Sequence, residues 1–332
     1  MKHIFISKTY AFLYFFVCFS LISCNSGSNT ISSQNQLITI DTYNYNPGNK
    51  TAVNISVGGS APIKAEIDTG SDMTVVNESF IGPNIIKTTE SLSITYGGGQ
   101  NTVSGYLAYG SVTFTTSNGT TISSESTTPI LVVTSGSVDE GGGNNAILGL
   151  RMNNQVSVKL YLPSPYNQMM ILNRPLNRII FGELSISQIN KFANIQGITT
   201  TCINYKIVPT QNNQCWILAE SAVNYTVTEF GGSESNYNYE TLFDSGEGFA
   251  NFYLSPVPIW MSYDSNNVIL TPISVTANTS QGPIPIPLTT QSYYHNSSGN
   301  TVNPGNNLFN YYQILFDQVD GVIGFQNYNN PL

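Results

Sequence analysis

Charged side chains are scarce in this chain of 332 residues. Lys, Arg, Asp and Glu make up 9% of it, against roughly 25% in an average soluble protein. Only 11 residues are Lys or Arg and the formal net charge is −8, so no basic cluster exists that could follow a phosphate backbone. Nucleic acid is therefore excluded as a partner. The polar surface must come from Asn, Ser, Thr, Gln and Tyr, as in many β-rich secreted proteins.

Histidine is nearly absent as well. His3 lies in the expected export signal, which leaves His295 in the polar stretch 294–298. A site of the Ser-His-Asp or Cys-His kind would depend on this one side chain, and a His-rich zinc site cannot form. We expect His295 to lie in a surface loop, and we expect neither a metal nor a cofactor.

The apolar run Ala11–Phe19 is too short to span a membrane, which takes about 20 residues. It follows Lys2 and Lys8, a pattern typical of an export signal, here residues 1–23. The run ends in Leu21–Cys24, which resembles the bacterial lipobox, where the cysteine is lipidated and becomes the mature N-terminus. The alternative is an ordinary signal peptide with a chance cysteine near its cleavage site.

We therefore expect an exported protein of the bacterial cell envelope, held on the membrane by lipid on Cys24, or a secreted protein if the lipobox is not used. Asn25 follows where Asp would favour the inner membrane, so the outer membrane is favoured. Residues 24–36 carry no hydrophobic periodicity, which predicts a flexible tether.

Cysteine is the other rare residue, with 4 in the chain. Cys18 lies in the signal and Cys24 is the expected lipid site. Cys202 and Cys215 remain, and in an oxidising compartment we expect a disulfide between them. Two free buried thiols are the alternative.

Short alternating segments dominate the rest of the chain. Ile63–Ile67 places three apolar side chains on one face of a strand and two charges on the other. Residues 92–96 alternate in the same way, and 130–133 form a short apolar run. The best helical pattern is residues 183–195. The sequence therefore predicts an all-β fold with few helices.

The length exceeds the usual 100–200 residues of one domain. We expect an N-terminal lobe over residues 37–185 and a C-terminal lobe over 186–332.

The sharpest local pattern is Asp68-Thr69-Gly70, which returns as Asp244-Ser245-Gly246, 176 residues later. In each copy an apolar strand ends in a carboxylate, a hydroxyl and a glycine that permits a tight turn. Two carboxylates held close together share one proton. One then takes a proton from water while the other protonates a substrate carbonyl. This chemistry needs no histidine, metal or cofactor.

Further segments line up with the two motifs along the chain, in an order that resembles the pepsin-like aspartic peptidases. They are Lys50–Gly59, Ser91–Gly99, Ala146–Leu150, Tyr311–Asp317 and Gly321–Phe325. The resemblance covers most of residues 50–325. It implies a bilobal double β-barrel with a central active-site cleft, an aspartic endopeptidase acting on an extended polypeptide, and a monomer.

When the family's residue roles are transferred to the matching positions, the resemblance implies that Asp68 and Asp244 are the catalytic pair. Thr69 and Ser245 would bind the opposite loop's backbone and brace the two lobes. Ser71 would hydrogen-bond the outer oxygen of Asp68.

The remaining implied residues bind substrate. Gly70 and Gly246 would offer their backbone carbonyls to it. Tyr96, Gly97 and Gly98 would form a flap over the cleft.

Four features depart from the family. Glu247 stands where a Ser or Thr usually steadies the second aspartate, and Val75 replaces a Trp that usually accepts the flap tyrosine. Thr301–Gly305 is a poor match to the second apolar-apolar-Gly segment. Residues 25–49 leave too little room for a basic inhibitory propeptide.

These departures keep a second function open, a catalytically inactive binding or inhibitor protein on the same fold at the cell surface. A carbohydrate-binding or structural β protein would leave the duplicated motif unexplained.

Lipidation of Cys24 predicts that the protein partitions with membranes. Cys24→Ala should leave it unprocessed or released, because the thiol that would carry the lipid is gone. Membrane fractionation, with mass spectrometry of the mature N-terminus, checks this. A mature N-terminus elsewhere, without lipid mass, would rule the anchor out.

Overall fold

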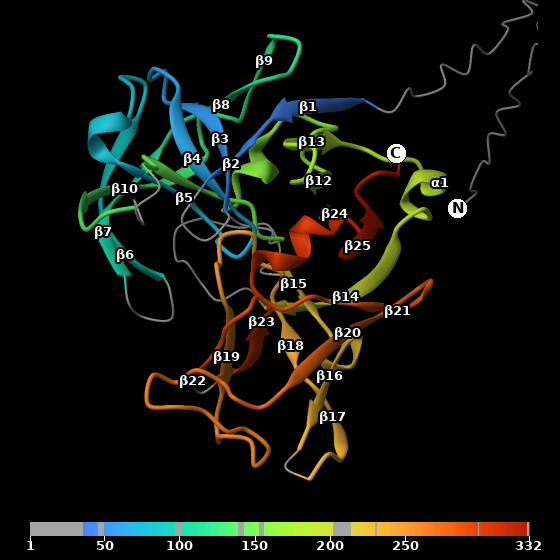
Figure 1. Cartoon of the computed structure of the whole chain (residues 1–332). Coiled ribbons are helices and arrows are strands. Elements are labelled where there is room, and N and C mark those ends of the chain that lie inside the picture. Colours follow the sequence, from blue (N-terminus) through green and yellow to red (C-terminus); the bar gives the residue numbers. More distant parts are fainter. Residues whose placement is uncertain are drawn as a thin grey trace, which may run out of the picture. The chain divides into compact units, whose positions relative to one another are not determined.

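The computed structural model describes residues 36–45, 50–96, 101–138, 143–152, 156–201, 214–229, 231–297, 299–330 and 332. They belong to one compact unit, Asn35–Leu332. Most of its elements are β-strands, so the predicted all-β fold is confirmed (Figure 1). No helix in these ranges is long and apolar enough to cross a bilayer. The division into lobes at residue 185 stays a prediction.

The first half of the chain builds a ten-stranded sheet in the order β6-β7-β10-β5-β11-β4-β3-β8-β9, with β2 beside β3. Its strands are β2 (Tyr43–Tyr45), β3 (Lys50–Val57), β4 (Ile63–Asp68), β5 (Thr74–Asn77), β6 (Ile86–Tyr96), β7 (Asn101–Tyr109), β8 (Val112–Thr115), β9 (Thr121–Ser123), β10 (Pro129–Ser135) and β11 (Ala146–Gly149).

The second half builds two four-stranded sheets, β17-β16-β20-β21 and β18-β23-β19-β22. Their strands are β16 (Val223–Thr228), β17 (Glu234–Asn238), β18 (Glu240–Thr241), β19 (Ala250–Leu254), β20 (Ile273–Thr279), β21 (Gly282–Pro285), β22 (Ser292–Asn296) and β23 (Asn300–Asn303).

A seven-stranded sheet, β1-β13-β12-β24-β25-β14-β15, takes strands from distant parts of the chain. They are β1 (Leu37–Asp41), β12 (Met169–Asn173), β13 (Arg178–Gly182), β14 (Ala193–Thr201), β15 (Gln214–Leu218), β24 (Tyr312–Asp317) and β25 (Val322–Asn327). Short 3-10 turns are η1 (Glu78–Phe80), η3 (Val158–Tyr161), η4 (Glu220–Ala222) and η5 (Asn306–Asn310).

One strand arrangement occurs twice and positions the two aspartate motifs. β11 lies between β4 and β5, parallel to the first and antiparallel to the second. β23 lies between β18 and β19 in the same way. β10 runs parallel to β5, and β22 runs parallel to β19. Each motif therefore occupies the loop between two strands that a third strand holds apart.

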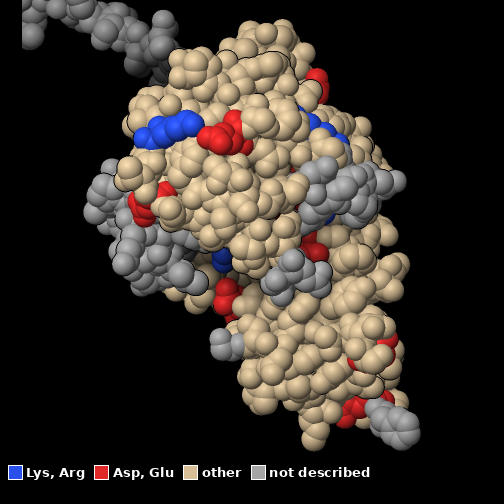
Figure 2. Space-filling view, turned by 90° about the vertical axis from the view of Figure 1, so that its left-hand side faces the viewer, with Lys and Arg blue, Asp and Glu red and all other residues tan. Residues whose placement is uncertain are grey.

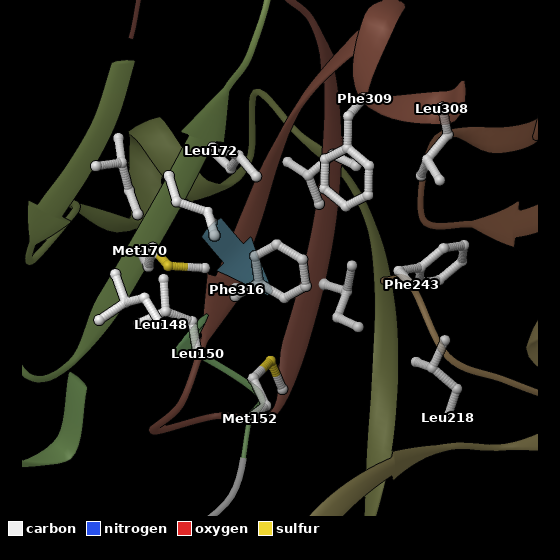
Figure 3. Close-up of a cluster of buried hydrophobic side chains, with 14 of the residues drawn as sticks. Leu148, Leu150, Met152, Met170, Leu172, Leu218, Phe243, Leu308, Phe309 and Phe316 are labelled. Carbon is white, nitrogen blue, oxygen red and sulfur yellow. The ribbon is translucent and has the colours of Figure 1, made fainter. Parts of the chain in front are cut away.

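Apolar side chains from all these parts meet in one core cluster. Figure 3 shows part of it, with Leu148 from β11, Phe316 from β24 and Phe243 from the loop that carries the second motif. All three are at most 2% exposed. Because Leu148 pairs with Ile67 and Phe243 directly precedes Asp244, this core supports both aspartate loops from within.

The helix expected over residues 183–195 is wrong in extent. Only α1 (Ile186–Ile189) is helical, and a capping box of Ser185 and Gln188 starts it. From Ala193 the chain continues as β14, paired with β25. Of the apolar side chains that suggested a helical face, Ile186 and Ile189 lie in α1, whereas Leu184 precedes the helix and Phe192 follows it, just before β14. Pairing in the sheet therefore outweighed local propensity from Ala193 onward.

The scarcity of charge is visible on the surface. On the face drawn in Figure 2, Lys, Arg, Asp and Glu are few. Both signs occur in its upper part, whereas in its lower part only acidic side chains are coloured. Among the described atoms of this face, positive side chains are therefore absent from the lower part.

The core cluster predicts a contrast between two leucines. Leu148→Ala should lower the free energy of unfolding by about 2–5 kcal/mol, because it leaves a cavity beneath the first aspartate loop. Leu270 is 60% exposed, so Leu270→Ala should cost less than about 0.5 kcal/mol. Denaturant titration of both variants measures the difference, and equal costs would contradict the proposed packing.

Candidate active site

Four hydrogen bonds cross between the two aspartate loops. The Thr69 N–H donates to Ser245 Oγ (3.1 Å), and the Ser245 N–H donates to Thr69 Oγ1 (2.9 Å). Thr69 Oγ1 donates to the Phe243 carbonyl (2.8 Å), and Ser245 Oγ donates to the Ile67 carbonyl (2.7 Å). Both hydroxyl residues are 2% exposed. Each hydroxyl thus donates and accepts, and the structure places Thr69 and Ser245 where the resemblance implied.

The cross-bonded loops bring the carboxyl groups of Asp68 and Asp244 within hydrogen-bonding reach of each other. A Cβ on Gly70 would overlap the Asp244 carboxyl, and one on Gly246 would lie 2.7 Å from Asp68 Cγ. Neither glycine has a positive φ. The motif therefore needs glycine for this close approach, and not for the tight turn that the sequence suggested.

Asp68 is held by three donors and is 6% exposed. Its Oδ1 accepts the N–H groups of Gly70 (2.8 Å) and Ser71 (2.9 Å), and its Oδ2 accepts Ser71 Oγ (2.5 Å). Ser71 therefore lies at the place, and makes the bond, that the resemblance implied.

Asp244 is held differently. Its Oδ1 accepts the Gly246 N–H (2.8 Å), as the first loop would suggest, but its Oδ2 accepts the side-chain amide of Asn303 (2.9 Å). Asn303 ends β23 and is 4% exposed. It was not among the residues expected from the sequence. The available signal was that it falls in Thr301–Gly305, the segment that matched the family poorly.

That segment does occupy the place expected of it. A Cβ on Gly149 would collide with the Met73 backbone, and one on Gly305 would lie 2.8 Å from the Phe249 backbone. Met73 and Phe249 each lie five residues after an aspartate of the pair. Gly149 and Gly305 are therefore equivalent, although the residues before Gly305 differ from the family pattern.

Both aspartates have pKa values above the ordinary value. Burial is the main cause for Asp68, and the charge of Asp244 adds to it, while donors from Ser71 and Gly70 act in the opposite direction. Burial also raises the pKa of Asp244. The pair therefore keeps a proton at pH values where a free aspartate, with a pKa of about 3.9, has lost it.

Glu247 also acts on the pair of Asp68 and Asp244. It is half-buried, and its Oε1 accepts the Phe249 N–H at 3.3 Å. Its charge raises the pKa of Asp244 further. It also helps burial, the larger cause, to raise the pKa of Tyr253 to about 12.

The flap is described only in part. Tyr96 ends β6, pairs with Asn101 on β7, and packs against the apolar cluster that contains the fully buried Val75. Gly97 and Gly98 lie outside the described residues.

A buried charge pair lies behind the first aspartate. Glu66, on the same strand as Asp68, contacts Lys50 at 2.9 Å and accepts the Tyr45 hydroxyl at 2.5 Å. Burial raises the pKa of Glu66 to about 7 despite Lys50. Of the two charged side chains expected on one face of Ile63–Ile67, Glu66 is therefore buried, at 3% exposed, and Lys64 is half-buried.

The prediction that His295 lies in a surface loop is wrong. It lies in β22 and not in a loop, and its ring stacks on Tyr253 with centroids 4.9 Å apart. Its Nε2 lies 2.7 Å from Asn251 Oδ1. Burial lowers its pKa. The polar neighbours of His295 concealed the strand, in which Tyr294 is buried.

Several expectations fall outside the described part. These are the signal over residues 1–23, Cys24 with the tether as far as residue 35, Cys202, and the side chain of Cys215. The strands flanking residues 202–213 do pair as an antiparallel hairpin.

The fold is that of the pepsin-like aspartic proteinases. The crystal structure of the aspartic proteinase from Irpex lacteus is similar, with a TM-score of 0.57 and 15% sequence identity. The match covers 88% of this chain and 97% of that one. No protein-family model and no curated protein sequence matches the chain. The comparison thus supports the fold predicted from the sequence.

The cross-bonds predict that one hydroxyl contributes much more than another. Thr69→Val keeps the shape but leaves the Phe243 carbonyl and Ser245 N–H without a partner, so unfolding should become easier by roughly 1–3 kcal/mol. Thr74 is fully buried, and its hydroxyl has no hydrogen-bond partner among the described residues. Thr74→Val should therefore be neutral or stabilising. Denaturant unfolding compares them, and equal losses would count against a bracing role for Thr69.

Proposed function

We propose that this chain is an aspartic endopeptidase that hydrolyses peptide bonds with water activated by Asp68 and Asp244. The observation that carries the proposal is the meeting of the buried Asp68 carboxyl with the half-buried Asp244 carboxyl, held by reciprocal bonds between Thr69 and Ser245. Two carboxyls that share one proton supply a base and an acid at the same point.

The chemistry follows from that shared proton. The ionised carboxyl accepts a proton from water, whose oxygen attacks the carbonyl carbon of the peptide. The neutral carboxyl gives its proton to the carbonyl oxygen, which yields a tetrahedral diol. Return of one proton to the pair and transfer of the other to the departing nitrogen breaks the C–N bond. The pair then holds one proton again.

The proposed substrate is a polypeptide in extended conformation, bound by a monomer. Gly70 and Gly246 lie beside the carboxyls, so their backbone carbonyls are near enough to accept N–H groups of such a chain. Tyr96, at the end of a long hairpin strand, would cover it.

We also propose that the protein is exported and held in the bacterial cell envelope by lipid on Cys24. The lipobox is the basis of this proposal. The oxidising compartment that follows supports a disulfide between Cys202 and Cys215.

Glu247 favours one competing function, a silent binding or inhibitor protein. A like charge beside Asp244 opposes its ionisation, and a pair unable to ionise has no base. Pepstatin, which imitates the transition state of aspartic peptidases, separates the cases, because a site built for that state should bind it in acid.

Asp68→Asn or Asp244→Asn should each abolish cleavage of an unstructured protein in acid, since either removes half of a pair that acts as a unit. Wild-type activity should follow a bell-shaped pH profile. It should rise as pH falls through the higher pKa of the pair, and fall once both carboxyls are protonated. Because burial raises both pKa values, the alkaline limb should lie above the pH at which a free aspartate ionises.

The matched control is Asp320→Asn, on the exposed turn after β24, which should leave activity unchanged. Full activity in both variants of the pair would refute the proposal.

A further inference from the structure

We infer that Asn303 is a positioning residue that holds the Asp244 carboxyl in place of the hydroxyl missing at position 247. The inference rests on the proposed function. Asn303 Nδ2 donates to Asp244 Oδ2 at 2.9 Å, from the strand that lies between the two strands of the second aspartate loop. It therefore reaches the carboxyl from β23, not from the motif itself.

The orientation of the amide is fixed from its other end. Asn303 Oδ1 accepts the Gly305 N–H at 3.0 Å. An amide turned the other way would set its NH₂ against that N–H and its oxygen against a carboxylate oxygen, so only one orientation satisfies both neighbours. Since Asn303 is 4% exposed, water is a poor substitute for either bond.

The first loop shows which bond is being replaced. There Ser71, three residues after Asp68, donates its hydroxyl to Oδ2. Three residues after Asp244 stands Glu247, whose carboxylate has no proton to donate when ionised and which accepts from Phe249 instead. The two aspartates thus have equivalent outer-oxygen donors that come from different places in the sequence.

The replacement also affects the charge on Asp244. The ionisable groups acting on it are Asp68 on the opposite loop and Glu247 on its own, with Tyr253 on the strand that follows. Glu247 disfavours the ionised form, whereas a hydrogen bond from a neutral amide favours it. Asn303 therefore counteracts the effect of the Glu247 charge on Asp244. A Ser or Thr, the family's usual residue at position 247, would bring no such charge.

Removing the donor should lower turnover. Asn303→Ala should reduce kcat roughly ten- to hundred-fold, the loss expected for a hydrogen bond to a charged group, with little change in KM. The acid limb of the pH profile should move to higher pH, because the ionised form of Asp244 has lost a donor and its pKa rises.

Rescue tests the replacement directly. Glu247→Thr in the Asn303→Ala background should restore most of kcat, since a hydroxyl at 247 can donate as Ser71 does. Glu247→Thr alone should move the acid limb to lower pH, because a like charge has gone. Asn303→Asp preserves shape if the alanine variant folds poorly, and should lose activity wherever the new carboxyl is ionised.

The control is Asn251→Ala. Asn251 faces Asn303 across the strand pair and is 6% exposed, but its amide bonds the Phe249 carbonyl and His295. It should leave the acid limb in place. Identical profiles for the two alanine variants, or no rescue by Glu247→Thr, would overturn the inference.

Titration of the Asp244 carboxyl by carbon NMR, assigned with Asp244→Asn, separates this inference from the proposed function. A raised pKa in Asn303→Ala supports the positioning role even if no form of the protein cleaves peptides. An unchanged pKa refutes it even if the wild type is an active peptidase.

Discussion

The reciprocal bonding of Thr69 and Ser245 is the constraint on which the site depends. Two ionised carboxylates about 4 Å apart repel by about 4 kcal/mol at an effective dielectric of 20. Four buried hydrogen bonds, at about 1 kcal/mol each, are of the same size. The bonds alone therefore only balance the repulsion, and a shared proton is needed to remove it. The geometry that joins the loops is thus also what makes the pair hold one proton.

The two halves meet one requirement by different means. Asp68 and Asp244 both need a donor at the outer oxygen. In each half the strand that leads to the aspartate has a parallel neighbour, β11 beside β4 and β23 beside β18. The first half takes the donor from the aspartate loop itself. The second takes it from the intervening strand. In this chain each aspartate therefore has a donor at its Oδ2, although a different part of the repeated arrangement supplies it.

Local pattern predicted the strands and both aspartate motifs, because an alternating strand that ends in Asp, hydroxyl and Gly is visible within a few residues. Asn303 and Glu66 were missed because their roles arise from register between strands far apart in sequence. The helix over residues 183–195 failed for a related reason, since pairing with β25 decided the conformation from Ala193 onward. His295 failed because its polar neighbours imitate a loop.

The scarcity of positive charge suits this site. Within the described chain, the groups that chiefly set the pKa values of Asp68 and Asp244 are carboxyls and uncharged donors. A lysine or arginine nearby would favour the ionised forms and lower both pKa values by one to three units. The pair would then lose its shared proton over most of the acid range. Neutral amides and hydroxyls fix the carboxyl oxygens with a weaker effect on their charge, which leaves burial and mutual repulsion to keep one proton between them.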